Sequence, residues 1–145
     1  MQERLGIDIG STFITVFSQN KNRVVFRFRH SGKIAESLKK IFAETDSDTL
    51  VRFTGKTAAE FSGVVKDLCI SEAEAINAEL KKEKFFGGED FAIISIGASS
   101  LKKYTIKSGT ISDISSNSLC ASGTGLFLEE QAERLSIDLE NMPAL

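Results

Sequence analysis

The sequence predicts an α/β protein built on a mixed β-sheet. Three short segments, Leu5–Ile9, Phe13–Ser18 and Arg23–Arg29, follow one another through short connections rich in turn-forming residues. This pattern is typical of an antiparallel meander. After residue 30 the apolar patterns of strands and helices alternate, which indicates parallel strands with helices packed on the sheet.

The remaining elements of the first half follow from apolar spacing and capping signals. Residues 33–43 carry an apolar stripe at helical spacing. Beyond this helix we expect a strand at Leu50–Thr54, a short helix at Lys56–Phe61, a strand at Val64–Ile70 and a helix from Ser71. Ser71 and Glu74 have the spacing of a capping box, and Ala73, Ile76 and Leu80 form the apolar stripe of that helix.

The second half repeats the same order of elements. Strands are expected at Phe91–Ile96, Leu101–Lys107 and Thr110–Ser115, followed by a helix at Thr124–Leu135. We therefore expect a structural repeat, with a first lobe at residues 1–88 and the beginning of a second lobe at residues 89–145. Only one helix follows the second meander, so this lobe is expected to be incomplete and to self-associate through its open sheet.

Composition excludes several classes of function. A net charge of -2 with dispersed lysine and arginine gives no basic surface for nucleic acid, and no apolar run reaches the length of a membrane span. We expect a soluble cytoplasmic protein. Cys69 and Cys120 are not part of a CxxC motif, and the single histidine, His30, is expected to be a solvated loop residue.

The first candidate site is the segment Gly6–Thr12. Gly10 permits a tight turn whose backbone N–H groups face one anion, and the hydroxyls of Ser11 and Thr12 add donors. Asp8 has the oxygen chemistry that Mg²⁺ prefers. The alternative is an ordinary hairpin with a Gly-Ser-Thr turn.

The second candidate site is the small-residue segment that precedes the last helix. Gly123, Thr124 and Gly125 open this helix, and free N–H groups at a helix N-terminus attract anions. The same groups lower the pKa of a nearby thiol, so Cys120 is a candidate thiolate ligand. The alternative is that Cys120 is a small buried residue beside a helix cap.

These segments resemble the ATPase activators of 2-hydroxyacyl-CoA dehydratases and the related ATPase subunits of benzoyl-CoA reductase. The resemblance rests on Gly6–Thr12, on the strand that ends at Gly97, and above all on Cys120–Gly125 with the Phe127-Leu128-Glu129 that follows. It implies an actin-like ATPase (ribonuclease H-like) fold with ATP and Mg²⁺ between two lobes, and it adds Gly97 and Ser99 to the nucleotide site.

The resemblance also implies a partner enzyme and a second cofactor. Members of this family form a homodimer that holds one [4Fe–4S] cluster, and Cys120 matches one of its ligands. ATP hydrolysis in the family drives an electron onto a 2-hydroxyacyl-CoA dehydratase-type partner. The chain would then be the N-terminal part of such an activator.

Three positions depart from the family pattern and favour a second hypothesis. Thr15 stands where a lysine is usual, and Ser95 and Ser100 stand where two aspartates are usual. Serine lacks the charge that holds Mg²⁺, so metal binding and hydrolysis are expected to be weak or lost. The alternative function is a degenerate actin-like domain with a structural or regulatory role; a carbohydrate or acetate kinase is a third, less favoured reading.

Overall fold

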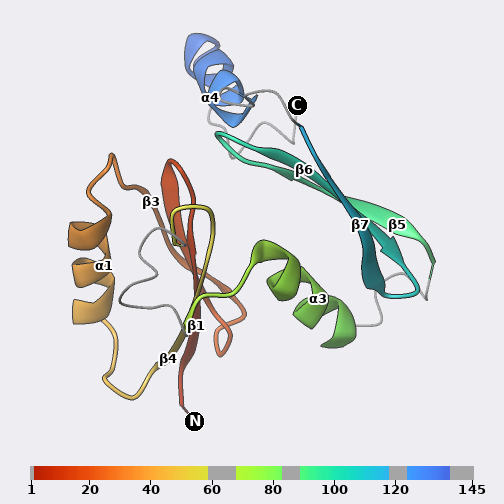
Figure 1. The fold of residues 1–145 in the computed structure, drawn as a ribbon. Helices are drawn as coiled ribbons and strands as arrows, with labels where there is room; N and C mark the ends of the chain where they lie inside the picture. Colours follow the sequence, from red (N-terminus) through yellow and green to blue (C-terminus); the bar gives the residue numbers. More distant parts are fainter. Residues whose placement is uncertain (1, 59–67, 83–88, 118–123, 138–145) are drawn as a thin grey trace. The chain divides into compact units, whose positions relative to one another are not determined.

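The computed structural model describes residues 2–58, 68–82, 89–117 and 124–137 (Figure 1). The described elements are β1 (Arg4–Ile9), β2 (Phe13–Ser18), β3 (Arg23–Arg29), α1 (Ile34–Ala43), β4 (Leu50–Thr54), α3 (Glu72–Lys82), β5 (Phe91–Ile96), β6 (Leu101–Lys107), β7 (Thr110–Ser116) and α4 (Thr124–Arg134). The chain divides into two compact units, Met1–Ile76 and Asn77–Leu145.

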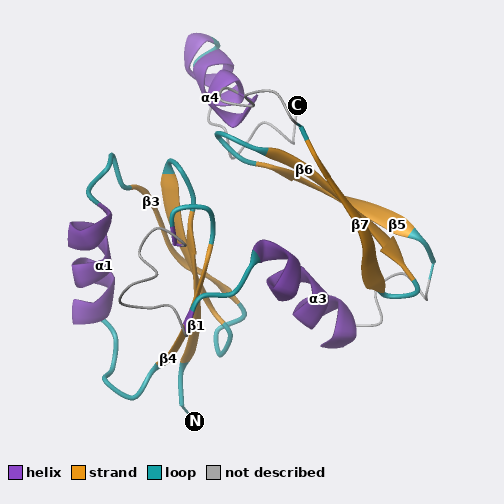
Figure 2. Ribbon diagram, viewed as in Figure 1, coloured by secondary structure: helices purple, strands orange, loops and turns teal. Residues whose placement is uncertain are grey.

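The first unit contains a four-stranded sheet in the order β3-β2-β1-β4 (Figure 2). The strands β1, β2 and β3 form the predicted antiparallel meander, whereas β4 pairs in parallel with β1. A parallel neighbour requires a crossover connection, and α1 supplies it. The mixed α/β sheet expected from the sequence is therefore confirmed.

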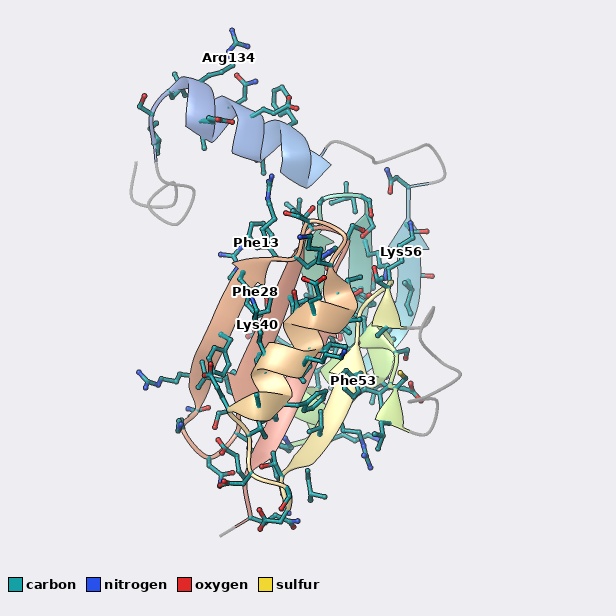
Figure 3. All side chains as sticks on the ribbon, turned by 90° about the vertical axis from the view of Figure 1, so that its left-hand side faces the viewer. Phe13, Phe28, Lys40, Phe53, Lys56 and Arg134 are labelled. Atoms are coloured by element: carbon teal, nitrogen blue, oxygen red, sulfur yellow. The ribbon has the colours of Figure 1, made fainter. Side chains whose placement is uncertain are left out.

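One face of this sheet shares a core with α1. The cluster comprises Leu5, Ile7, Ile9, Ile14, Val16, Ile34, Ile41, Phe53 and Ala58. Phe28 and Phe53 lie on the same face, beneath α1 (Figure 3). Since side chains alternate across a strand, Asp8 and Thr15, which are partners in register, lie on the opposite face. The core thus leaves the acidic end of β1 accessible.

The second unit contains a three-stranded antiparallel sheet in the order β5-β6-β7. Tyr104 and Ile106 are its most buried side chains, at 1% and 0% exposure. A two-residue turn joins β6 to β7, and Ser108 and Gly109 both have positive φ, at 50° and 74°. Two positive φ values characterise the tight hairpin turn whose twist matches that of the flanking strands.

After β4 the sequence predicts a short helix at Lys56–Phe61 and a strand at Val64–Ile70. Both lie largely outside the described residues. At the end of the expected strand, Cys69 pairs in parallel with Phe53, and the N–H of Ile70 donates to the Phe53 carbonyl at 2.8 Å. The backbone therefore runs beside β4 at this point.

The capping box is confirmed, but the apolar stripe of α3 behaves differently from the expectation. The N–H of Ser71 donates to Glu74 Oε2 at 2.7 Å, and the N–H of Glu74 donates to Ser71 Oγ at 3.1 Å. No side chain of α3 is buried, so Ala73, Ile76 and Leu80 are only partly covered. None of the helices in the described ranges combines the length and hydropathy needed to cross a bilayer.

The expectation for His30 is wrong. This side chain is only 7% exposed, because it turns inward at the end of β3 and hydrogen-bonds to the backbone on both sides. A polar ring can be buried when both of its nitrogens have partners.

Candidate functional site

The β1–β2 turn is a tight connection closed by its glycine. The N–H of Gly10 donates to the carbonyl of Phe13 at 3.0 Å, and Ile9 pairs with Ile14 across the base of the turn. A Cβ at Gly10 would lie 3.3 Å from the Phe13 oxygen, so glycine suits this position. Ser11 is exposed at the tip of the turn.

The β5–β6 turn has the same construction. The N–H of Gly97 donates to the carbonyl of Ser100 at 2.8 Å, and Ile96 pairs with Leu101. The glycine, the bond three residues ahead and the pairing five residues apart all match the first turn. Gly97 and Ser99 are therefore the counterparts of Gly10 and Thr12, and each unit presents one Gly turn of this kind.

Asp8 is the charged group of the first turn. It is exposed at the end of β1, and its neighbours in register are Thr15 on β2 and Thr54 on β4. Gly55 follows β4 with a φ of +100°, and a Cβ there would overlap Asp8 Oδ1 and lie 2.5 Å from the Ile9 oxygen. Only a glycine allows the end of β4 to approach the Asp8 carboxylate so closely.

Thr54 provides a test of whether a ligand fits beside Asp8. Its Oγ1 is buried and has no hydrogen-bond partner within the described part of the chain. Leaving such a group unsatisfied costs about 1–3 kcal/mol. A water molecule or a ligand oxygen held near Asp8 would remove this cost, which fits a hydrated Mg²⁺ or a phosphate at this end of the sheet.

The second turn carries the opposite charge. Ser95 occupies the position that corresponds to Asp8, and its partner in register is Lys102, which corresponds to Thr15. The first turn thus combines an acid with a hydroxyl, and the second combines a hydroxyl with an ammonium group. A carboxylate suits a metal ion and an ammonium group suits a phosphate, so each turn has its own ligand chemistry.

The remaining predicted residues are not all described. Cys120 and Gly123 lie outside the described residues, and only the backbone is described for Thr124 and Gly125, which begin α4. Across the described ranges no three His, Cys, Asp or Glu side chains gather as a metal site. An ion near the first turn would therefore depend on Asp8, water and ligand oxygens.

Sequence reasoning missed three residues of this region. Gly55, His30 and Thr57 all contact the first turn from the segments that follow β3 and β4, far away in the chain. The only sequence signal for Gly55 is a glycine directly after a strand, which marks a close approach of two backbones. For His30 and Thr57 no local pattern exists, because their partner is the Gly10 carbonyl.

Comparison with known proteins identifies the fold. No family model and no curated protein matches the sequence. Among solved structures, component A of the (R)-2-hydroxyglutaryl-CoA dehydratase of Acidaminococcus fermentans aligns with 97% of the chain at 22% identity and a TM-score of 0.61. The ethanolamine utilization protein EutJ of Carboxydothermus hydrogenoformans aligns with 99% at 17% identity and a TM-score of 0.54.

A third structure, MreB 5 of Spiroplasma citri bound to AMPPNP, aligns with 93% of the chain at 14% identity and a TM-score of 0.55. A protein of Bacteroides thetaiotaomicron described as having an actin-like ATPase fold is also similar, with a TM-score of 0.54. The chain has the actin-like ATPase fold. It spans 57%, 61% and 56% of the component A, EutJ and MreB 5 chains, respectively.

Proposed function

We propose that this chain supplies the N-terminal part of a nucleotide site of the actin-like type and binds the phosphates of ATP with Mg²⁺. The observation that carries this proposal is the first Gly turn, which has the Asp8 carboxylate and the buried hydroxyl of Thr54 beside it. Backbone N–H groups in such turns donate hydrogen bonds to an anion without any special side chain.

Asp8 would hold the metal ion through water, as Mg²⁺ usually retains several waters in protein sites. The fit is supported by the buried Thr54 hydroxyl and by Gly55, which keeps the end of β4 against the carboxylate. Lys102 gives the second Gly turn a positive charge, which suits a phosphate. The segment Gly123–Gly125 would offer N–H groups to an anion by itself.

The finer proposal is that the chain is the N-terminal part of an ATP-binding activator of a 2-hydroxyacyl-CoA dehydratase-type enzyme. It is supported by the motif around Cys120 and by the likeness to the dehydratase component A. In this proposal two copies would share a [4Fe–4S] cluster with Cys120 as one ligand, and the cluster would supply electron transfer. The same proposal divides the chain into a first lobe at residues 1–88 and the beginning of a second lobe at residues 89–145.

A specific observation favours the alternative of a domain that binds nucleotide but does not hydrolyse it. Ser95 and Ser100 flank the second turn in place of carboxylates. Hydrolysis of ATP depends on positioned metal ions and on a group that orients the attacking water, and serine supplies no charge for either task. Such a domain would act through its shape, in a structural or regulatory role.

The test is a titration of the ¹⁵N-labelled chain with Mg-ATP, followed by the amide resonances. Saturable shifts are expected at Gly10–Thr12 and Gly97–Ser100, with a dissociation constant near 1 mM, or about -4 kcal/mol. Asp8→Asn should remove the dependence on Mg²⁺. Asp48→Asn is the matched control, because this exposed residue precedes β4 and so lies at the opposite end of the sheet.

One result would overturn the proposal, and another would contradict only the expected weakness of binding. Shifts scattered over the chain, or none at the two turns, would exclude a phosphate site there. A dissociation constant in the low micromolar range, about -8 kcal/mol, would show that the serines of the second turn do not weaken the site.

A further inference from the structure

His30 is buried at the junction of β3 and α1, and its ring contacts two backbone segments. The N–H of Gly32 donates to Nδ1 at 3.1 Å, and Nε2 lies 3.2 Å from the carbonyl oxygen of Gly10. A backbone N–H can only donate, so Nδ1 is the acceptor nitrogen. The hydrogen of the neutral ring is therefore on Nε2, which donates to Gly10.

Thr57 contacts the same turn from the other side. Its hydroxyl donates to the Gly10 carbonyl at 3.3 Å, and its backbone N–H donates to the Ile9 carbonyl at 3.2 Å. The backbone N–H of His30 donates to the Thr12 carbonyl at 3.1 Å. Three carbonyl groups of the first turn are thus held by residues that follow β3 and β4.

The direction of one amide follows from these bonds. A trans peptide is planar, so the N–H of Ser11 points opposite to the carbonyl of Gly10. Two donors hold that carbonyl, and they thereby fix the Ser11 N–H in the reverse direction. We propose that His30 and Thr57 are positioning residues that preset the backbone conformation of the first Gly turn for a phosphate.

This inference rests on the proposed nucleotide site, and it adds how the site is preorganised. A turn of glycine and small hydroxyl residues has many accessible conformations, and ordering them on binding costs affinity. The hydrogen bonds from His30 and Thr57 to the Gly10 carbonyl, which we call the clamp, reduce this cost because they order the turn before the ligand binds. His30 also lines a cavity of about 570 Å³ together with Phe28 of β3 and Lys40 of α1; these last two residues are labelled in Figure 3.

Two substitutions at His30 test its two hydrogen bonds separately: the one to the Gly10 carbonyl and the one from the Gly32 N–H. His30→Gln places an amide nitrogen at the position of Nε2 and keeps the donor to Gly10. His30→Asn places an oxygen at the position of Nδ1, keeps the acceptor for the Gly32 N–H as an Asx-turn, and loses the donor. Thr57→Val removes the second donor at nearly constant shape, and it serves as the test if His30→Asn fails to fold.

The first readout needs no ligand. Backbone order parameters at Gly10–Thr12 should be near 0.85 in the wild type and in His30→Gln, and should fall toward about 0.6 in His30→Asn and Thr57→Val. Order parameters unchanged by both of these variants would overturn the clamp, whatever the chain binds.

The second readout is affinity for Mg-ATP in the same titration. Loss of one hydrogen bond should weaken binding about threefold to tenfold in His30→Asn and Thr57→Val, and His30→Gln should stay within about twofold of the wild type. Equal losses in His30→Gln and His30→Asn would mean that the ring only fills space, which also overturns the inference. A wild-type chain without saturable binding would refute the nucleotide site alone, and the order parameters would then decide the clamp.

Discussion

Gly55 offers the most direct test of the contact between β4 and the Asp8 carboxylate. Its φ of +100° is strained for any residue with a Cβ, and a Cβ would also overlap Asp8 Oδ1 and lie 2.5 Å from the Ile9 oxygen. The backbone strain costs about 1–3 kcal/mol. Forcing an extra methyl group into a packed site costs about 1–3 kcal/mol more. Gly55→Ala should therefore destabilise the chain by about 2–6 kcal/mol.

Two other glycines of the same unit separate these contributions. Gly32 has a φ of +79° with nothing within 4 Å of an added Cβ, so Gly32→Ala should show the backbone strain alone. Gly6 lies in β1 without positive φ and with nothing within 4 Å, so Gly6→Ala should be neutral or stabilising by about 0.5–1 kcal/mol.

The assay is equilibrium unfolding in urea, compared at constant slope. The order of stability should be Gly6→Ala, wild type, Gly32→Ala and then Gly55→Ala. A total stability of about 5–15 kcal/mol is usual for a domain, so the last variant could be largely unfolded at room temperature. If Gly55→Ala and Gly32→Ala were equally stable, the close approach of β4 to Asp8 would be refuted.

Two further predictions concern the helix start at Ser71 and the two thiols. Hydrogen bonds from the backbone and then the hydroxyl of Ser71 lower the pKa of Glu74 from 4.5, so the capping box stabilises α3 above that pH and its contribution is lost as the pH falls through the lowered pKa. A carboxyl titration by NMR should show Ser71→Ala raising the pKa of Glu74 in part, because the backbone N–H of residue 71 remains, and an unchanged pKa would contradict the contribution of the hydroxyl. Cys69 packs against the core, with its Sγ 3.8 Å from the Ala58 carbonyl, so anaerobic alkylation with mass spectrometry should label Cys120 first. Under the activator proposal, Cys120→Ser should abolish iron–sulfur reconstitution in the full-length dimer while Cys69→Ser should not, and faster labelling of Cys69 would remove the main support for that proposal.

The sequence determined the elements of this protein because they depend on local patterns. Alternating apolar residues predicted the strands β1 to β7 within a residue or two wherever the structure describes them. Ser71 and Glu74 predicted the start of α3, since a capping box involves residues only three positions apart. The two Gly turns were also visible, although only as candidates.

Tertiary structure alone decided how the first turn is held. Pairing of β4 with β1 in parallel places Gly55 against Asp8, and the turn after β3 places His30 against Gly10. Gly10 lies 20 positions before His30, and Asp8 lies 47 positions before Gly55, so no local pattern links either pair. The sequence therefore predicted a solvated His30. The fold buries this side chain and gives both of its ring nitrogens a hydrogen-bond partner.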